Sequence, residues 1–272
     1  AIADAKAELY EGLEPDGVAI YPADDPLADR LAGHAKRSSA AFMLDFGRAA
    51  SAAIRIESFE TGLGGSDGVV NVLGVRVPFH LAATGDHWAW NAGAVFAAAA
   101  AAGLDAKDVA AALALVDAEA GRGRAVPVAL PQGGQFTLLD DAYNANPVSM
   151  AAAIASLGSA EPGPGGRRIA VLGDMLELGP KSPELHRSLA PALIEADVDA
   201  VFTCGALMRE LHDHLPERLQ AGYAPSAAEG RAMVASALRA GDAGVIKGSN
   251  GSGLHKIAAV LADGSAFTLT EA

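Results

Sequence analysis

The chain has 272 residues, of which 51% are hydrophobic and 19% charged, so disorder is excluded and the length suits about two packed domains. The formal net charge of −13 argues against a nucleic-acid binder that relies on a basic field and against a protein of anionic membrane surfaces. A single cysteine, Cys204, excludes an intramolecular disulfide and indicates a reducing compartment, and the longest apolar run, 92–104, is too short to span a bilayer.

The sequence pattern of residues 1–158 predicts a mixture of helices and strands. Helices are expected at 1–13, 27–34, 91–102 and 105–116, and strands at 17–22, 40–44, 52–59 and 69–81, the last three joined by hairpins. A further hairpin of 126–130 and 136–139 precedes a polar loop at 140–150 and a helix at 149–157. Because the chain lacks an initiator Met and opens inside a helical pattern, we expect it to be the C-terminal part of a longer protein.

The Pro/Gly segment SAEPGPGG is typical of a link between domains, so we expect domains at 1–158 and 159–272. Beyond it, strands are predicted at 168–172, 200–204, 243–246 and 266–269, and helices at 184–195, 206–214, 227–240 and 253–261. This alternation predicts an α/β domain with an open, mostly parallel sheet and helices on both faces. Loops after the strands form the site in such sheets, here 173–179, Gly205 and 247–253.

A cluster of acids and amides follows the strand at 136–139. In LLDDAYNANPVSM, two carboxylates and two asparagines lie within seven residues. Adjacent acids at a strand end suit Mg²⁺ or a ribose hydroxyl, because both require hard oxygen acceptors. The alternative is an Asx-rich turn whose side chains satisfy its own backbone, and spacing alone favours neither.

Two loops of the second predicted domain also carry polar residues. VLGDMLELG places two acids between a strand and a helix, where a capped turn is the alternative. IKGSNGSGLHK sets three glycines, two serines and a lysine ahead of a helix, which can present backbone N–H groups to an anion. It is not a Walker A loop, since G-x-x-x-x-G-K-[ST] is absent from the sequence.

Three further features lie nearer the N-terminus. In GDHWAWNAG, His87 and Asn91 are four residues apart at a helix start and share one face, where helix capping is the alternative. GRGR sets Arg122 and Arg124 in a loop that suits bidentate phosphate contact or, alternatively, plain solvation. Lys6, on an acidic helix, has the pattern of a surface lysine in salt bridges.

Two enzyme classes find no support in the sequence. None of the seven histidines has H-E-x-x-H spacing, which excludes a zincin. No G-x-S-x-G elbow is present, which argues against a serine hydrolase.

Taken together, DDAYNANPVSM, VLGDMLELG and KGSNGS resemble the Mur ligases of peptidoglycan synthesis. AKAELYEGL, GVAIYPADDP and GDHWAWNAGAVFAA fit the same family in the same order, so the resemblance covers essentially the whole chain. The pair YNANP and GDM-x-ELG is similar to the branch that joins D-alanyl-D-alanine to UDP-N-acetylmuramoyl-tripeptide. The K-x-E and G-x-H-x-x-x-N pieces are shared with folylpolyglutamate ligases. The resemblance implies a partial central ATPase domain followed by a Rossmann-like C-terminal domain.

The resemblance also implies a reaction. ATP phosphorylates the carboxylate of the UDP-MurNAc-tripeptide, and the amine of D-Ala-D-Ala attacks the acyl phosphate to form an amide and release phosphate. ATP and Mg²⁺ are the implied cofactors, and the two peptides are the implied partners, with no nucleic acid and no membrane span. A cytoplasmic enzyme that is a monomer at full length is expected.

Residue roles carry over by matching motifs. Lys6 matches a lysine that is carbamylated in the family, which would make it an anionic group that supports a metal. His87 and Asn91 match the G-x-H-x-x-x-N element, whose Asn contacts adenine. Arg122 or Arg124 matches a Gly-Arg that touches the ribose and phosphate of ATP, and the doubled GRGR leaves both registers open.

The later motifs match the remaining roles. Asp141 matches the acid that holds the ribose, and Tyr143, Asn144 and Asn146 match residues beside the reacting centre. The loops expected to face the incoming dipeptide carry Asp174, Glu177, Lys247 and Ser249. The family commonly carries an Arg and a Met where this chain has Gly253 and Leu254.

The family's P-loop, its Mg²⁺-binding Glu and His and its UDP-sugar domain have no match in this sequence and are expected upstream of Ala1. We therefore expect the 272-residue chain alone to be inactive, with exposed apolar surface on residues 1–158. Two alternatives remain: another Mur or folylpolyglutamate-type amino-acid ligase, and a non-catalytic nucleotide-binding remnant.

Overall fold

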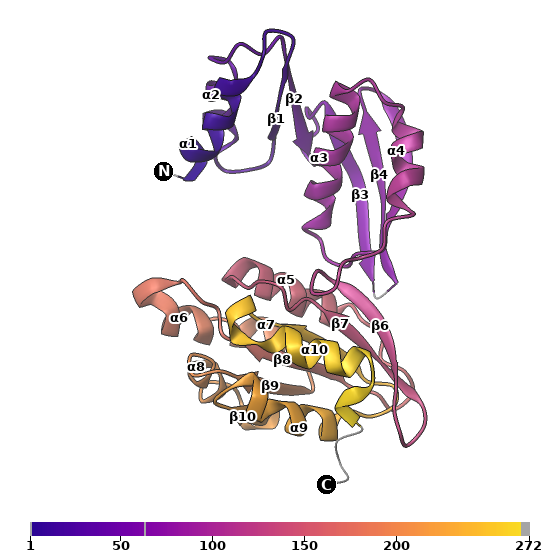
Figure 1. Cartoon of the computed structure of the whole chain (residues 1–272), viewed down its shortest axis with the longest axis vertical. Coiled ribbons are helices and arrows are strands. Elements are labelled where there is room, and N and C mark those ends of the chain that lie inside the picture. Colours follow the sequence, from indigo (N-terminus) through magenta and orange to yellow (C-terminus); the bar gives the residue numbers. More distant parts are fainter. Residues whose placement is uncertain (1, 63, 268–272) are drawn as a thin grey trace. The chain divides into compact units, whose positions relative to one another are not determined.

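The computed structural model describes residues 2–62 and 64–267 and divides the chain into two compact units (Figure 1). The first unit comprises Ala1–Glu60, Ser66–Leu81 and Asp86–Asp117, and the second comprises Thr61–Gly65, Ala82–Gly85 and Ala118–Ala272. Among the described helices, none has both the length and the apolar character needed to cross a membrane.

The first unit is a five-stranded sheet with helices packed on it. Its strands, in spatial as well as chain order, are β1 (Val18–Pro22), β2 (Phe42–Gly47), β3 (Ile54–Gly62), β4 (Gly65–Val72) and β5 (Val75–Leu81). Its helices are α1 (Ile2–Ala7), the 3-10 helix η1 (Glu8–Gly12), α2 (Ala28–Ala35), α3 (Trp88–Ala101) and α4 (Ala106–Leu113). The alanine-rich α3 packs closely on β1 and β2, and its Phe96 ring meets Phe79 edge-on with centroids 5.4 Å apart.

The hairpin expected between the strands at 40–44 and 52–59 is replaced by a parallel pair. β2 and β3 pair only through Phe46 with Ile54 and Gly47 with Arg55. The chain between them therefore does not reverse direction, and within this connection the Asp45 carboxylate accepts the Ala53 N–H at 2.8 Å. Residues 69–81 do form a hairpin, since β4 and β5 are antiparallel.

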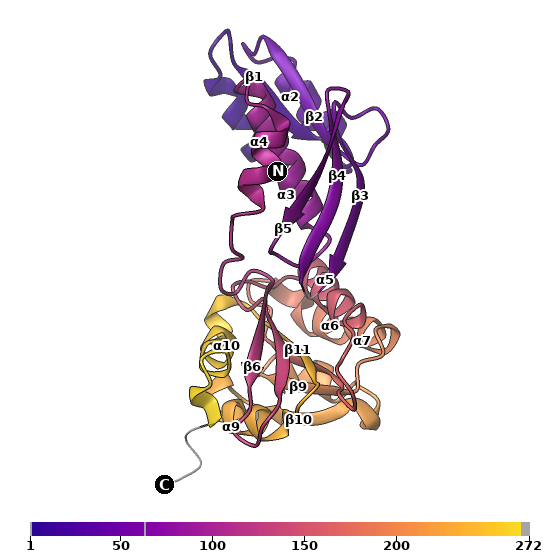
Figure 2. The same ribbon diagram turned by 90° about the vertical axis from the view of Figure 1, so that its right-hand side faces the viewer.

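The second unit is a six-stranded sheet in the spatial order β10-β9-β8-β11-β7-β6. Strands β6, β9, β10 and β11 of this sheet are labelled in Figure 2. Its strands are β6 (Arg124–Ala129), β7 (Gln135–Asp140), β8 (Arg168–Gly173), β9 (Ala200–Cys204), β10 (Gln220–Ala224) and β11 (Ala243–Lys247). Its helices are α5 (Pro147–Gly158), α6 (Ser182–Arg187), α7 (Ala190–Glu195), α8 (Arg209–His212), α9 (Ala227–Ala237) and α10 (Leu254–Ala262), with short 3-10 helices η2 (Gly179–Lys181), η3 (Glu217–Leu219), η4 (Asn250–Ser252) and η5 (Ser265–Phe267). All neighbours are parallel except β6 and β7, as an open, mostly parallel sheet requires.

The domain boundary expected between residues 158 and 159 falls inside this second unit. β7 pairs with β11 from Thr137 to Asp140, so the β6–β7 hairpin completes the sheet on that side. Helix α5 packs on β8 and β11, and its Ile154 shares a core cluster with Leu172. The Pro/Gly segment therefore connects two parts of one unit, because β11 needs β7 to pair its second edge.

Alternating side chains of the central strands supply the two faces of the sheet. Leu139, Leu172 and Val245 belong to one buried cluster together with α5 and α7. Their neighbours Leu138, Val171 and Ile246 belong to the other, together with α9 and α10. This period of two, with apolar residues at every position, is why these strands appear in the sequence as continuous apolar runs.

Several local predictions differ from the structure. Strand β10 was not predicted, because its sequence QAGYA is neither an apolar run nor an alternation. The single helix predicted at 184–195 is divided into α6 and α7. The strand predicted at 266–269 begins in the 3-10 helix η5, while residues 268 and 269 lie outside the described residues.

Candidate active site

Loops that follow the parallel strands meet at one edge of the second unit's sheet. β7, β8, β9 and β11 all run in the same direction, so their carboxyl ends lie together. The polar residues predicted on these loops are therefore neighbours in space, although residues 141 and 247 are more than a hundred positions apart.

Lys247, at the end of β11, is tied to the loop that follows β7. Its Nζ donates to Asp141 Oδ2 at 2.7 Å, to the Asn144 carbonyl at 3.0 Å and to the Asp141 carbonyl at 3.3 Å. The Lys247 side chain is only 3% exposed. All three donors of its ammonium group thus find acceptors in one loop, and the lysine positions that loop.

Ser249 joins a third loop to the other two. Its backbone N–H donates to the Asp174 carbonyl at 3.0 Å, and its Oγ accepts the Leu176 N–H at 3.0 Å. The same hydroxyl lies 3.4 Å from the Ala145 carbonyl, to which it donates. The buried segment 247–249 therefore links the loop after β7 to the loop after β8.

The loop after β8 carries the predicted acids Asp174 and Glu177. Asp174 Oδ1 accepts the Met208 N–H at 2.8 Å and so reaches the loop after β9. A side chain at Gly205, whose φ is +126°, would collide with the Asp174 carboxylate, which explains the glycine there. Glu177 is exposed and has a φ of +64°, an unusual conformation for this residue type.

His186 supports this loop from behind, a role that no sequence pattern indicated. It is fully buried on α6, where its Nε2 accepts the Met175 N–H at 3.0 Å. Its Nδ1 lies 2.6 Å from the Ser182 carbonyl, a contact that requires a proton on Nδ1. The ring is therefore a neutral Nδ1–H tautomer that accepts at Nε2.

The glycine-rich GRGR segment is fastened to Asp140. The buried carboxylate accepts the Gly121 N–H at 2.8 Å and the Ala142 N–H at 3.3 Å, and the Asp140 carbonyl accepts the Gly123 N–H at 2.9 Å. Burial raises the pKa of Asp140 above its ordinary value, partly offset by these backbone N–H donors. Gly123 has a φ of +79°, and a Cβ there would lie 2.6 Å from the Thr84 carbonyl oxygen, so this turn depends on glycine.

The two predicted arginines of this segment have different surroundings. The Arg122 guanidinium lies over the Tyr143 ring, 4.1 Å from its centroid, and its Nε is 3.2 Å from Glu119 Oε2. Tyr143 N–H in turn donates to the Gly121 carbonyl at 3.0 Å. Arg124 is instead the first residue of β6 and is exposed. The structure thus brings Arg122, but not Arg124, against Tyr143.

The asparagines of YNANP make local contacts. Asn146 caps α5: its Oδ1 accepts the Ser149 N–H at 2.9 Å, and Ser149 Oγ accepts the Asn146 N–H at 3.0 Å. Asn144 Oδ1 accepts the Ala145 N–H at 2.9 Å. The Asx-rich turn considered as the alternative for this motif is therefore present, and the Asn144 carbonyl is also one of the acceptors of Lys247.

Cys204 ends β9 beneath this edge and is buried. Burial, with a smaller contribution from the Asp174 carboxylate, raises the pKa of its thiol to about 11. The side chain is therefore a thiol at neutral pH and is not a nucleophile of the site.

The remaining predicted residues belong to the first unit. Lys6 is exposed on α1, and Asn91 is exposed in the first turns of α3. His87 is the N-cap residue of α3, and its ring lies 5.5 Å from that of Trp88. Among residues 2–62 and 64–267, no three His, Cys, Asp or Glu side chains come together as a metal site would require.

Comparison with known proteins identifies relatives for both units. Residues 1–99 match the family model of the Mur ligase middle domain, and residues 121–250 match that of the Mur ligase glutamate ligase domain. The start of the second match agrees with the start of the long segment of the second unit, at Ala118.

Similar proteins of known name share one description, UDP-N-acetylmuramoyl-tripeptide–D-alanyl-D-alanine ligase. The relative from Bacillus subtilis is 31% identical over 206 residues, 76% of this chain and 42% of that protein. The relative from Mycobacterium tuberculosis H37Rv is 29% identical over 294 residues, 96% of this chain and 54% of that protein. A crystal structure of MurF from Acinetobacter baumannii matches with a TM-score of 0.80 and 25% identity, over 96% of this chain and 55% of that one. This chain thus spans about half the length of the curated relatives it matches.

Proposed function

Because this chain belongs to the Mur ligase family, we propose that it is part of an enzyme that joins D-alanyl-D-alanine to UDP-N-acetylmuramoyl-tripeptide in peptidoglycan precursor synthesis. The observation that carries the proposal is the agreement of the relatives: proteins of that one description match 94–96% of this chain in Rickettsia prowazekii and M. tuberculosis.

The linked loops of the second unit support a role in binding the dipeptide. Glu177 is exposed at the sheet edge where ligands bind in open parallel sheets, and its carboxylate suits the ammonium group of an incoming dipeptide. We assign the same role to Asp174, which the Met208 N–H orients. Lys247 and Ser249 act by holding the loops at their positions.

The segment around Asp140 supports a role in binding ATP. Arg122 presents a guanidinium group that is 44% exposed in its side chain and is steadied by the Tyr143 ring. We assign it, in preference to Arg124, the contact to ribose and phosphate. Asp141 would accept the ribose hydroxyl, with the carboxylate oriented by Lys247.

In the first unit, His87 and Asn91 are exposed near the N-terminus of α3, and we assign them the contact to adenine. We place Asn144 and Asn146 beside the reacting centre, where their side chains would fix the backbone of the loop after β7.

Mg²⁺ does not find a complete site among the described residues. Lys6 is accessible to CO₂, and carbamylation would convert it to an anionic oxygen ligand, but one such group does not hold a hard cation alone. We therefore assign no catalytic step to a metal held by these residues.

The proposed reaction couples two substitutions. The tripeptide carboxylate attacks the γ-phosphorus of ATP and releases ADP, forming an acyl phosphate. The amine of D-Ala-D-Ala attacks the acyl carbon, loses a proton, and expels phosphate as the amide forms. Positioning and charge neutralisation supply most of the rate, which fits a site made of loops braced by buried contacts.

We further propose a cytoplasmic enzyme, a monomer at full length, that binds no nucleic acid, in keeping with a net charge of −13. Two alternative functions predict different assay results: another amino-acid ligase of the family, and a non-catalytic remnant that binds nucleotide.

The test is phosphate release by the protein expressed from the complete reading frame, with UDP-MurNAc-tripeptide in the presence and absence of D-Ala-D-Ala. Release that needs both peptides is expected. Release with a single amino acid in place of the dipeptide would favour a sister ligase, and nucleotide binding without release would favour the remnant. The 272-residue chain, which has no Walker A sequence, should release no phosphate under the same conditions.

A further inference from the structure

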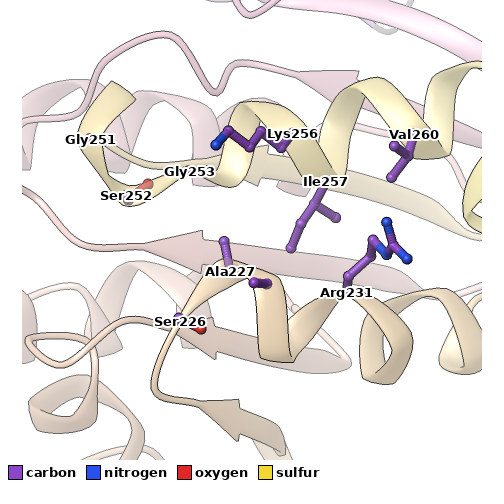
Figure 3. A pocket seen from close by; sticks show the side chains of 10 residues that line it. Ser226, Ala227, Arg231, Gly251, Ser252, Gly253, Lys256, Ile257 and Val260 are labelled. Carbon is purple, nitrogen blue, oxygen red and sulfur yellow. The ribbon is translucent and has the colours of Figure 1, made fainter.

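A cleft of about 600 Å³ lies between α9 and α10 in the second unit (Figure 3). Its lining comes from the start of α9, from the segment 251–253 and from one side of α10. None of the residues assigned above to ATP or to the dipeptide lines it. The cleft is therefore separate from those residues, and it lies on the face of the sheet that α9 and α10 cover.

Two cations line this cleft, one from each helix. Arg231 extends from α9 toward α10, and Lys256 lies along α10 (Figure 3). In the part of the chain that the structure describes, neither cation has an ion-pair partner. Four arginines of the same unit do pair with carboxylates: Arg122, Arg167, Arg187 and Arg209. The charges of Arg231 and Lys256, which line the cleft, are offset by no such pair among the described residues.

The wall between the cations is apolar. Ala227 and Ile257 are buried, and Val260 continues the surface along α10. The acid nearest in sequence to the start of α9, Glu229, accepts a hydrogen bond from Ser226 Oγ at 2.8 Å and is not part of the lining. The cleft therefore has one cation from each helix, Arg231 and Lys256, and an apolar wall between them.

We propose that this cleft binds a phosphate monoester that carries an apolar group. A monoester phosphate has a charge near −2 at neutral pH, which matches two cations better than a single carboxylate does. The apolar group would lie against Val260, which is only partly buried, and covering that surface would add affinity that a bare anion lacks.

One part of the cleft lining is continuous in sequence with the segment that links the loops after β7 and β8. Segment 251–253 lines the cleft, and Ser249, two residues earlier, links the loops after β7 and β8. A ligand here would contact 251–253, and Ser249, at the other end of this short segment, is already held by both loops.

Phenyl phosphate is the probe, titrated into the 272-residue chain and followed by amide chemical shifts. We expect shifts concentrated at 226–231 and 251–257, with weaker binding of inorganic phosphate, which lacks the ring, and of benzoate, which has one charge. Arg231→Gln and Lys256→Gln should each weaken binding of phenyl phosphate about tenfold. Arg218→Gln, which removes an exposed cation of η3 that does not line the cleft, should leave the affinity unchanged.

Several results would overturn the proposal. These are shifts centred on Arg122 and Tyr143, no shift at millimolar phenyl phosphate, equal affinity for benzoate, or the same loss in Arg218→Gln as in the two cleft variants. Far-UV circular dichroism of each variant separates lost binding from lost folding. The titration requires no ligase activity, so its outcome is independent of the proposed function.

Discussion

Replacement of Lys247 by methionine tests whether one buried ammonium group holds the loop after β7. The Lys247 side chain is 3% exposed and that of Asp141 is 16% exposed, with 2.7 Å between Nζ and Oδ2. Methionine keeps most of the buried stem but leaves the carboxylate without its cation. Removing one partner of a buried pair costs about 3–5 kcal/mol, and because Asp141 keeps some contact with water we expect about 3 kcal/mol.

The chain provides its own internal reference for this measurement. Its two tryptophans, Trp88 and Trp90, both belong to the first unit, whereas circular dichroism reports on both units. A loss of about 3 kcal/mol corresponds to a fall in Tm of roughly 6–12 °C for a unit of this size. We expect Lys247→Met to lower the Tm of the second unit by that amount and to leave the tryptophan fluorescence transition in place.

A double-mutant cycle decides whether the ion pair is the cause. Asp141→Asn combined with Lys247→Met should be less destabilised than the sum of the single variants, with a coupling of about 1–3 kcal/mol. Lys256→Met, on an exposed lysine of α10, is the matched control and should change stability by less than about 0.5 kcal/mol. Strict additivity, or an effect of Lys247→Met as small as that of the control, would refute the reasoning.

Three further predictions concern buried groups of the same unit. Burial raises the folded-state pKa of Asp140, so the folded carboxyl binds more protons than the unfolded one, and its contribution to stability falls as pH rises above the ordinary Asp pKa. The free energy of urea unfolding of the wild type, relative to that of Asp140→Asn, should therefore decrease from pH 4 to 7. A flat or rising difference contradicts this. His186→Ala should cost about 1–3 kcal/mol by leaving the Met175 N–H without an acceptor, and hydrogen exchange should quicken at Met175; unchanged exchange there would exclude the role. Cys204, with a thiol pKa of about 11, should react with a disulfide reagent at pH 8 only after unfolding, and rapid labelling of the folded chain would count against its burial.

Much of the second unit follows from the sequence because its strands are buried on both faces. Runs such as those of β8, β9 and β11 are apolar at consecutive positions and end in polar or glycine-rich loops, which fixes both the parallel sheet and the edge where the site forms. Strand β10 gives no such signal, since it lies at the sheet edge and needs fewer apolar residues.

The domain boundary could not be predicted because it depends on strand pairing over a long separation. A proline- and glycine-rich segment is compatible with a link between domains or with a loop inside one, and only the pairing of β7 with β11 decides between them. The role of His186 was hidden for a related reason. A single histidine has no spacing, and its acceptor function exists only where α6 passes behind the Met175 N–H.

The asparagines show that local and functional readings of a motif need not compete. Asn146 forms the N-terminal cap of α5, which local sequence rules predict, and the cap fixes the direction in which the preceding loop leaves the sheet. Lys247 donates to the Asn144 carbonyl in that same loop. A side chain can thus satisfy its own backbone and still position a site.

The place of β11 between β7 and β8 has an evolutionary consequence. Only a strand with both neighbours can contact the loops on each side, and the short segment 247–249 does so through one lysine and one serine. An insertion or deletion in either neighbouring loop would displace a contact that the other loop shares. In proteins that keep this arrangement, the lengths of the three loops should therefore change together or not at all. Loop length would then identify the site among related sequences.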